Sequence, residues 1–167
     1  MTDLAGILML EHVAIRNISI CTKSGEPDFA EFHSYLRNCH IEIEEKLVFP
    51  LVLASASKGE KELVSRIEHI RADHKLIETL AGNLGKWKET GNKQLYGDRL
   101  PLYYRLLVDH NRNEDETVFP IWKEVDGNEA RKAAKEALSI IESYGTGRYL
   151  EVIGIPRKAM DYLFGKI

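Results

Sequence analysis

One block of residues occurs twice in this chain and places the same polar side chains at the same spacing each time. The two copies span residues 40–50 and 110–120. Both begin with a histidine, have a glutamate four residues later and end in Val-Phe-Pro. Residues four apart lie on one face of an α-helix, about 6 Å from each other along its axis. Each block therefore predicts a helix that presents an imidazole beside a carboxylate, His40 with Glu44 and His110 with Glu114.

The rest of the chain also has helical periodicity. Apolar residues recur every three or four positions, and no clean two-residue alternation runs beside turn pairs such as Asn-Gly. We therefore expect an all-α domain. Breaks that contain glycine separate four long helices, and short connections between them favour an up-down-up-down four-helix bundle. The expected helices cover about residues 3–23, 27–56, 60–89 and 98–122, with Asp98 as the cap of the fourth.

The chain continues beyond these four helices. An Ala-, Lys- and Glu-rich stretch at 129–144 predicts a shorter helix, the glycine-containing stretch 145–155 predicts a loop, and Pro156 is expected to open a last amphipathic turn. This part contains no histidine. We expect residues 1–126 to form the bundle, whereas 127–167 form a helical extension that packs on it or pairs two copies of the chain.

Size and composition fit one globular domain. The chain has 167 residues, of which 44% are hydrophobic and 29% charged. Asp and Glu number 26 against 23 Lys and Arg, and a formal charge of −3 argues against a nucleic-acid partner. The longest apolar run is too short for a transmembrane helix and lacks the flanks of a secretory signal, so we expect a cytoplasmic protein with no membrane partner. The spacing of Cys21 and Cys39 indicates neither a thiolate metal site nor a redox pair.

Two further histidines extend the repeat. Glu11-His12 on the first expected helix resembles Asp73-His74 on the third. The chain is thus a helix pair used twice, which predicts an approximate two-fold axis. Four imidazoles and two carboxylates that faced only one another in a core would be costly to desolvate, and a metal pair removes this cost. Nitrogen and carboxylate ligands without thiolate favour iron or manganese.

The candidate ligands are therefore His12, His40, Glu44, His74, His110 and Glu114. Any one of these histidines alone would more often be a core residue with satisfied hydrogen bonds, and a single His-x-x-x-Glu is common by chance. The metal prediction rests on the repetition of the whole pattern. The Phe-Pro pairs that close both blocks are expected to be structural: the missing proline amide ends or bends the helix, and the phenylalanine closes the core.

Together these motifs resemble the hemerythrin HHE cation-binding family over residues 1 to about 126. The resemblance implies a four-helix bundle around a non-haem di-iron centre with an oxo or hydroxo bridge, and manganese or a mixed pair is an alternative. It implies a protein that binds or senses oxygen, nitric oxide or peroxide, or that handles iron. The alternatives are a di-iron enzyme, acting as an oxidase or peroxidase or in iron-sulfur cluster repair, and a metal-free helical interaction module. Binding is favoured over catalysis.

The oxygen-carrying hemerythrins resemble the chain less well. They have five histidines, with His-x-x-x-His on the third helix, whereas Ile70 and Glu78 lie four residues from His74 here. His69 is five residues from His74, about 140° around the helix, and is expected to point elsewhere. The pattern is closer to the four-His, two-Glu sites of hemerythrin-like iron sensors and of cluster-repair proteins, which places reversible oxygen transport in doubt.

The sequence leaves the roles of several further residues open. Glu78 could replace the missing imidazole, and Asp115 could act as a ligand beside Glu114, although Glu114 is preferred because it repeats Glu44. His33 precedes His40 by seven residues, and Tyr103 occupies the same place before His110. These two residues either line the approach to the metals or belong to the core or its rim.

Overall fold

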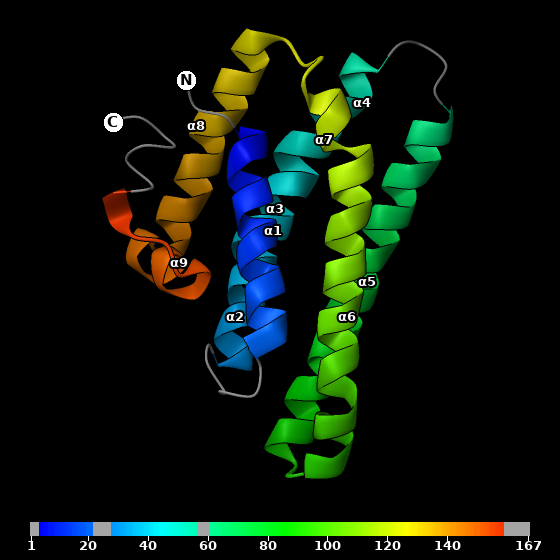
Figure 1. Cartoon of the computed structure of the whole chain (residues 1–167), viewed down its shortest axis with the longest axis vertical. Helices are drawn as coiled ribbons and strands as arrows, with labels where there is room; N and C mark the ends of the chain where they lie inside the picture. Colours follow the sequence, from blue (N-terminus) through cyan, green and yellow to red (C-terminus); the bar gives the residue numbers. More distant parts are fainter. Residues whose placement is uncertain (1–3, 22–27, 57–60, 159–167) are drawn as a thin grey trace.

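The computed structural model of the chain describes residues 4–21, 28–56 and 61–158 (Figure 1). Within these residues the regular structure is entirely helical, which confirms the all-α prediction. The first four segments are α1 (Leu4–Cys21), a long second helix over residues 29–55, α5 (Lys61–Glu89) and α6 (Lys93–Thr117). They run alternately down and up, so the expected up-down-up-down bundle is present. None of the described helices is long and apolar enough to cross a membrane.

The predicted helix over residues 27–56 is less regular than expected. It consists of α2 (Phe29–Tyr35), the π-helical turn η2 (Leu36–His40), α3 (Ile41–Ile43), a second π-helical turn η3 (Glu44–Val48) and α4 (Phe49–Ser55). In the two π turns the amides of Ile41 and Phe49 donate to carbonyls five residues earlier, those of Leu36 and Glu44. Such turns are rare and often occur at functional sites. Here the first π turn ends at His40 and the second begins at Glu44, so the two turns flank the predicted ligand pair.

The fourth helix begins earlier than predicted. Asn92 is its cap, and the Asn92 side chain accepts a hydrogen bond of 3.1 Å from the amide of Leu95. Asp98, the predicted cap, instead lies inside α6. The physical reason is the tight connection from α5, in which Gly91 takes a φ of 70° and leaves Asn92 in position to cap. Beyond Val118 the chain continues as the short helix α7 (Phe119–Trp122), so the helix is interrupted before Pro120, as expected for the Phe-Pro pair.

The C-terminal part is more helical than the sequence suggested. After α8 (Gly127–Tyr144) comes α9 (Thr146–Ile153), where a loop was predicted. The loop was predicted from the glycines in this stretch. In the structure Gly145 and Gly154, with φ of 108° and 66°, instead end α8 and α9 and leave α9 itself uninterrupted. The expected last turn beyond Pro156, like the end of the first helix and Pro27, falls wholly or largely outside the described residues.

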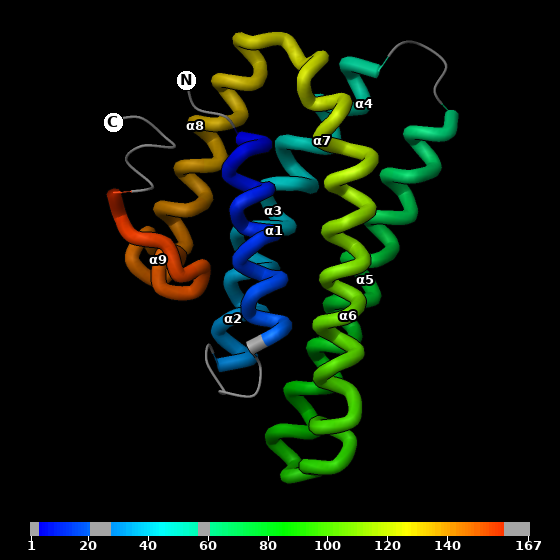
Figure 2. Tube along the Cα trace, viewed as in Figure 1, coloured from blue at the N-terminus to red at the C-terminus, as the bar shows by residue number. Residues whose placement is uncertain are grey.

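Two groups of helices lie on opposite sides of α1 and the second helix. The trace in Figure 2 shows α5 and α6 as a long hairpin on one side of α1 and α2, with α8 and α9 on the other side. The largest fully buried side chains are apolar or aromatic and include Leu8, Ile15, Phe32, Tyr35 and Ile67. Within the described part of the chain, the buried polar side chains are Glu11, His12, His40, Glu44, His74, His110, Asn111 and Glu114. A polar cluster in such a core needs internal partners or a ligand.

Candidate metal centre

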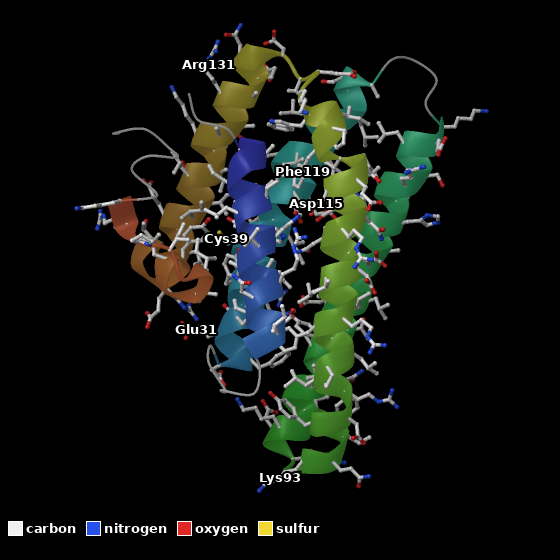
Figure 3. All side chains as sticks on the ribbon, viewed as in Figure 1. Glu31, Cys39, Lys93, Asp115, Phe119 and Arg131 are labelled. Atoms are coloured by element: carbon white, nitrogen blue, oxygen red, sulfur yellow. The ribbon has the colours of Figure 1, made fainter. Side chains whose placement is uncertain are left out.

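All six predicted ligands meet in the core of the bundle. His12 comes from α1, His74 from α5, and each of the two repeated blocks supplies one histidine and one glutamate. Their exposed fractions are 6% for His74 and at most 1% for the others. Figure 3 shows nitrogen and oxygen atoms gathered between α1 and α6, near the labelled Asp115.

The six residues form two overlapping sets of possible ligands. One set contains His12, His40, Glu44 and Glu114, and the other contains Glu44, His74, His110 and Glu114. Within each set the ligand atoms lie within 4.8 Å of one another. Because both glutamates belong to both sets, the arrangement suits two ions that share two carboxylates.

The distances agree with shared carboxylates. In each repeated block the histidine Nε2 faces the glutamate four residues later, at 3.2 Å for His40 and Glu44 and at 3.4 Å for His110 and Glu114. Glu44 also turns Oε1 toward His12 Nε2, at 3.6 Å, and Oε2 toward His74 Nε2, at 3.5 Å. One carboxylate therefore presents an oxygen to each half of the cluster.

The inward-facing atoms lack hydrogen bonds of their own. Among the described residues, His12 Nε2, His40 Nε2 and all four carboxylate oxygens of Glu44 and Glu114 are buried without a hydrogen-bond partner. The Nε2 atoms of His74 and His110 face each other at 3.1 Å. Buried polar atoms are nearly always satisfied, and six unsatisfied ones that converge are a specific exception. Since imidazole and carboxylate are ligands of iron and manganese, the donor set fits such ions.

A second layer of carboxylates faces the outer nitrogen of each histidine. The Nδ1 atoms of His12, His40 and His74 are hydrogen-bonded to carboxylates at 2.6–2.8 Å, and the fourth pair lies 3.8 Å apart. The four partners are Asp115 for His12, Glu11 for His40, Glu45 for His74 and Asp73 for His110. A carboxylate at Nδ1 fixes the ring and keeps the proton there, which leaves Nε2 free to bind a metal.

Two of these carboxylates are themselves paired with arginines. Arg16 donates to Asp115 at 2.8 Å, and Arg71 donates to Glu45 at 3.0 Å. Both carboxylates therefore have one oxygen on a histidine and the other on a guanidinium. Such a chain holds the imidazole by two successive hydrogen bonds.

Charge balance in the cluster depends on the same carboxylates. Burial alone would lower the pKa of His12, but the hydrogen bond to Asp115 and the nearby carboxylates of Glu114 and Glu44 outweigh it and raise that pKa well above its usual value. The pKa of His74 likewise rises to about 10 against the effect of burial, through Glu44 and Glu45. Burial would raise the pKa of Glu44, yet the neighbouring histidines hold it well below normal. Without metal, the raised pKa values of His12 and His74 favour protons that offset the charge of Glu44, and bound cations would replace those protons.

The two phenylalanines of the Phe-Pro pairs lie against the cluster. The ring of Phe119 is 5.4 Å from that of His12, and the ring of Phe49 stacks on that of His74 at 5.8 Å. The two contacts are equivalent in the internal repeat. They cover one histidine of each set with an apolar ring, as the structural role predicted for these pairs requires.

The remaining candidates lie outside the two sets. His69 is exposed on α5, as expected from its angle to His74. Glu78 pairs with His33 Nε2 and with Arg37, both at 3.2 Å, and belongs to neither ligand set. His33 and Tyr103, the residues at equivalent positions of the repeat, are hydrogen-bonded to each other at 2.8 Å.

The sequence alone missed the role of the outer carboxylates, although it contains a signal for them. Each is the immediate neighbour of a proposed ligand, in the pairs Glu11-His12, Glu44-Glu45, Asp73-His74 and Glu114-Asp115. Neighbours on a helix point about 100° apart, so the acid faces the next helix and binds a histidine there. In this way Asp115, left open as a ligand, supports His12 from behind.

Replacing an outer carboxylate should weaken metal binding without removing it. We expect Asp115→Asn to lower the affinity for ferrous iron by about 10–100-fold, because the amide holds the His12 ring less firmly. Asp109→Asn is the matched control, since Asp109 is an exposed acid on the same helix whose described ion pair is with Arg112. Anaerobic titration of both variants measures the effect, and equal affinities would contradict it.

Comparison with known families gives one result. The family model of the hemerythrin HHE cation-binding domain matches residues 3–122, a span that contains all six clustered residues. Comparisons with curated proteins and with solved structures return no match.

Proposed function

Because the chain belongs to the family of hemerythrin HHE cation-binding domains, we propose that its six clustered residues bind two iron ions. We further propose that the protein binds or senses a small molecule, such as oxygen, nitric oxide or peroxide, or handles iron. The observation that carries the proposal is the pair of overlapping ligand sets that share Glu44 and Glu114. Manganese or a mixed pair would use the same ligands.

Each half of the site has a defined set of ligands under this proposal. His12 and His40 would bind one ion, His74 and His110 the other, and the two glutamates would bind both. Four ligands from the chain do not fill the coordination shell of iron, and non-haem iron sites that react with oxygen keep such open positions. An iron pair would supply reversible electron transfer and a place for a small oxidant to bind.

The chain's own residues prepare the site for this chemistry. The outer carboxylates orient the imidazoles, and Phe49 and Phe119 cover His74 and His12 with apolar rings. Burial restricts the access of water and of large molecules, which favours a small ligand. The buried, unpaired ligand atoms also disfavour the alternative of a metal-free helical module, since a core without metal gains nothing from them.

Reconstitution tests the proposal directly. Purified protein supplied with ferrous iron should bind close to two irons per chain and develop oxo-bridged charge-transfer bands in air. The double substitution His40→Ala and His110→Ala should abolish binding, because it removes one imidazole from each set. His69→Ala is the control, since His69 is an exposed histidine outside both sets. A colourless protein that binds no metal would refute the proposal.

A further inference from the structure

The C-terminal helix α9 reaches the metal cluster through one side chain. Tyr149 is 1% exposed, and its hydroxyl donates a hydrogen bond of 2.5 Å to Oε1 of Glu11. The other oxygen of Glu11 accepts from His40 Nδ1 at 2.6 Å. A buried chain of two hydrogen bonds therefore joins α9, α1 and the second helix, and it ends on a proposed ligand.

Tyr149 donates to the carboxylate behind His40, as an arginine donates to the carboxylates behind two other histidines. Asp115 behind His12 and Glu45 behind His74 each accept from a partly exposed guanidinium. Glu11 differs because it is fully buried, and among the described residues its ion pair is with His40. A buried carboxylate needs hydrogen bonds on both oxygens, and the phenol supplies the second one. Burial and the nearby Glu11 carboxylate raise the pKa of Tyr149, so the hydroxyl keeps its proton and acts as a donor.

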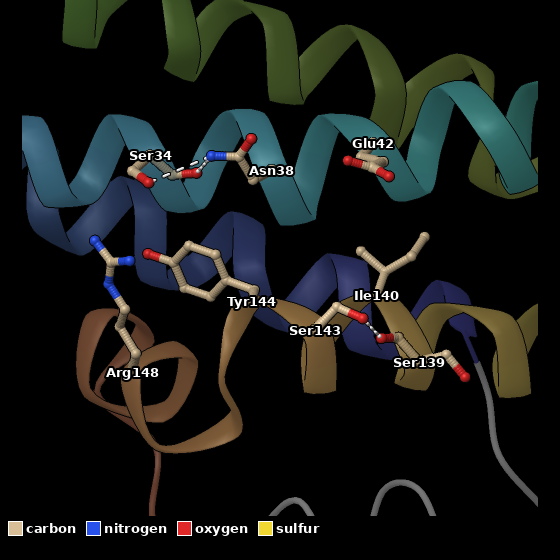
Figure 4. Close-up of a pocket in the computed structure, with 8 residues that line it drawn as sticks. All are labelled: Ser34, Asn38, Glu42, Ser139, Ile140, Ser143, Tyr144 and Arg148. Atoms are coloured by element: carbon tan, nitrogen blue, oxygen red, sulfur yellow. Dashed lines mark hydrogen bonds between the residues drawn. The ribbon is translucent and has the colours of Figure 1, made fainter.

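The surroundings fix Tyr149 in this place. Its ring packs edge-on against that of Tyr35 at 5.8 Å, and Tyr35 in turn lies beside the His40 ring. On the outer side, Arg148 of α9 pairs with Glu31 of α2 at 3.0 Å and lies over the Tyr144 ring. Figure 4 shows Arg148 and Tyr144 opposite Ser34, at one end of a pocket between α8 and the second helix.

The equivalent position in the other half of the site is different. Asp73 stands to His110 as Glu11 stands to His40 in the internal repeat, but the two groups are 3.8 Å apart. Asp73 is also partly exposed, with 29% of its side chain accessible. Within the described residues, α9 therefore contacts the outer carboxylate of one half of a nearly symmetric cluster.

We propose that Tyr149 is a positioning residue for the ion of His12 and His40, acting through Glu11 on the His40 ring. The inference rests on the proposed function, because it requires that His40 binds metal. It assigns the C-terminal helices a part in the site, although they lie beyond the residues 3–122 that match the family. It also predicts that the two ions differ in affinity and that metal binding stabilises the position of α9.

A titration of the metal-free full chain with ferrous iron under anaerobic conditions tests this. In Tyr149→Phe we expect the affinity for one of the two ions to fall about tenfold, because the Glu11 carboxylate loses one of its two fixed partners. The affinity for the other ion should stay within about twofold. Tyr144→Phe is the matched control, since it removes a hydroxyl from the same region that has no hydrogen-bond partner among the described residues.

Hydrogen exchange of the α9 amides provides a readout that a merely structural role would not give. Coupling between two sites is reciprocal, so iron should slow exchange at residues 146–153 in the wild type and in Tyr144→Phe, and much less in Tyr149→Phe. Glu11→Gln can no longer bind both partners as a carboxylate, so it should lower the affinity for the same ion. This variant is tested in place of Tyr149→Phe if Tyr149→Phe fails to fold.

The outcomes separate the two proposals. Wild-type protein that binds no iron would refute the proposed function and this inference with it. Wild-type protein that binds two irons, together with a Tyr149→Phe or Glu11→Gln variant that binds both ions with unchanged affinity and shows the wild-type protection of α9, would overturn the role of Tyr149 alone. A selective loss at one ion, with loss of the iron effect on α9, would support it.

Discussion

Iron is expected to raise the melting temperature of this protein by about 10–20 °C. A ligand that binds only the native state adds about 2.7 kcal/mol when its free concentration is 100 times the dissociation constant. Two such ions add about 5 kcal/mol, and for a chain of this size 1 kcal/mol corresponds to roughly 2–4 °C. The increase should be large because bound cations satisfy the buried atoms that have no hydrogen-bond partner among the described residues.

Scanning calorimetry with and without ferrous iron, under anaerobic conditions, measures this shift. A chelator should reverse it. The double variant His40→Ala and His110→Ala should melt at the same temperature with and without iron, whereas His69→Ala should behave like the wild type. Equal melting temperatures for wild-type protein in both conditions would indicate that its stability does not depend on a metal and would favour the helical interaction module.

The fold and the inner residues of the site could be predicted from the sequence because both depend on local spacing. Apolar periodicity locates the helices, and His40 and Glu44 share a face at a separation of four residues. The repetition of that pair as His110 and Glu114 then links two helices that are distant in the chain. Each pair lies within one helix and its repetition can be read from the sequence, so no knowledge of packing is needed to detect either.

The outer carboxylates depend on how the helices pack, and they were therefore missed. Glu11 is adjacent to His12 in the sequence, but its partner is His40 on another helix. A single helix shows only that Glu11 points about 100° away from His12, and the identity of the neighbouring histidine follows from the bundle. Tyr149 was still harder to find, because 138 residues separate it from Glu11 and its helix was predicted as a loop.

The outer contacts nevertheless follow the symmetry that the sequence repeat predicts. An acid on the first helix of each pair faces a histidine on the second, as Glu11 faces His40 and Asp73 faces His110. An acid on the second helix of each pair faces the first helix of the other pair, as Glu45 faces His74 and Asp115 faces His12. The four contacts form a closed ring around the bundle, because each helix contributes one outer carboxylate and one histidine that faces the carboxylate of a neighbouring helix.

Substitution of a shared glutamate should affect metal binding more than substitution of any single histidine. Glu44 belongs to both ligand sets, whereas His12 belongs to one. Glu44→Gln keeps the size of the side chain and removes the negative charge, so we expect both ions to bind at least about 100-fold more weakly, beyond the 10–100-fold typical of an outer partner. His12→Ala should weaken chiefly one ion.

Metal analysis after equilibration at a free iron concentration that just saturates the wild type distinguishes these cases. Wild-type protein should retain two irons per chain, His12→Ala about one and Glu44→Gln almost none. Glu42→Gln is the control, since Glu42 lies on the same helix outside both ligand sets and pairs with Lys46 at 2.6 Å. If Glu44→Gln kept one iron while His12→Ala lost both, the carboxylate would serve a single ion, and the two ions would not be joined through Glu44.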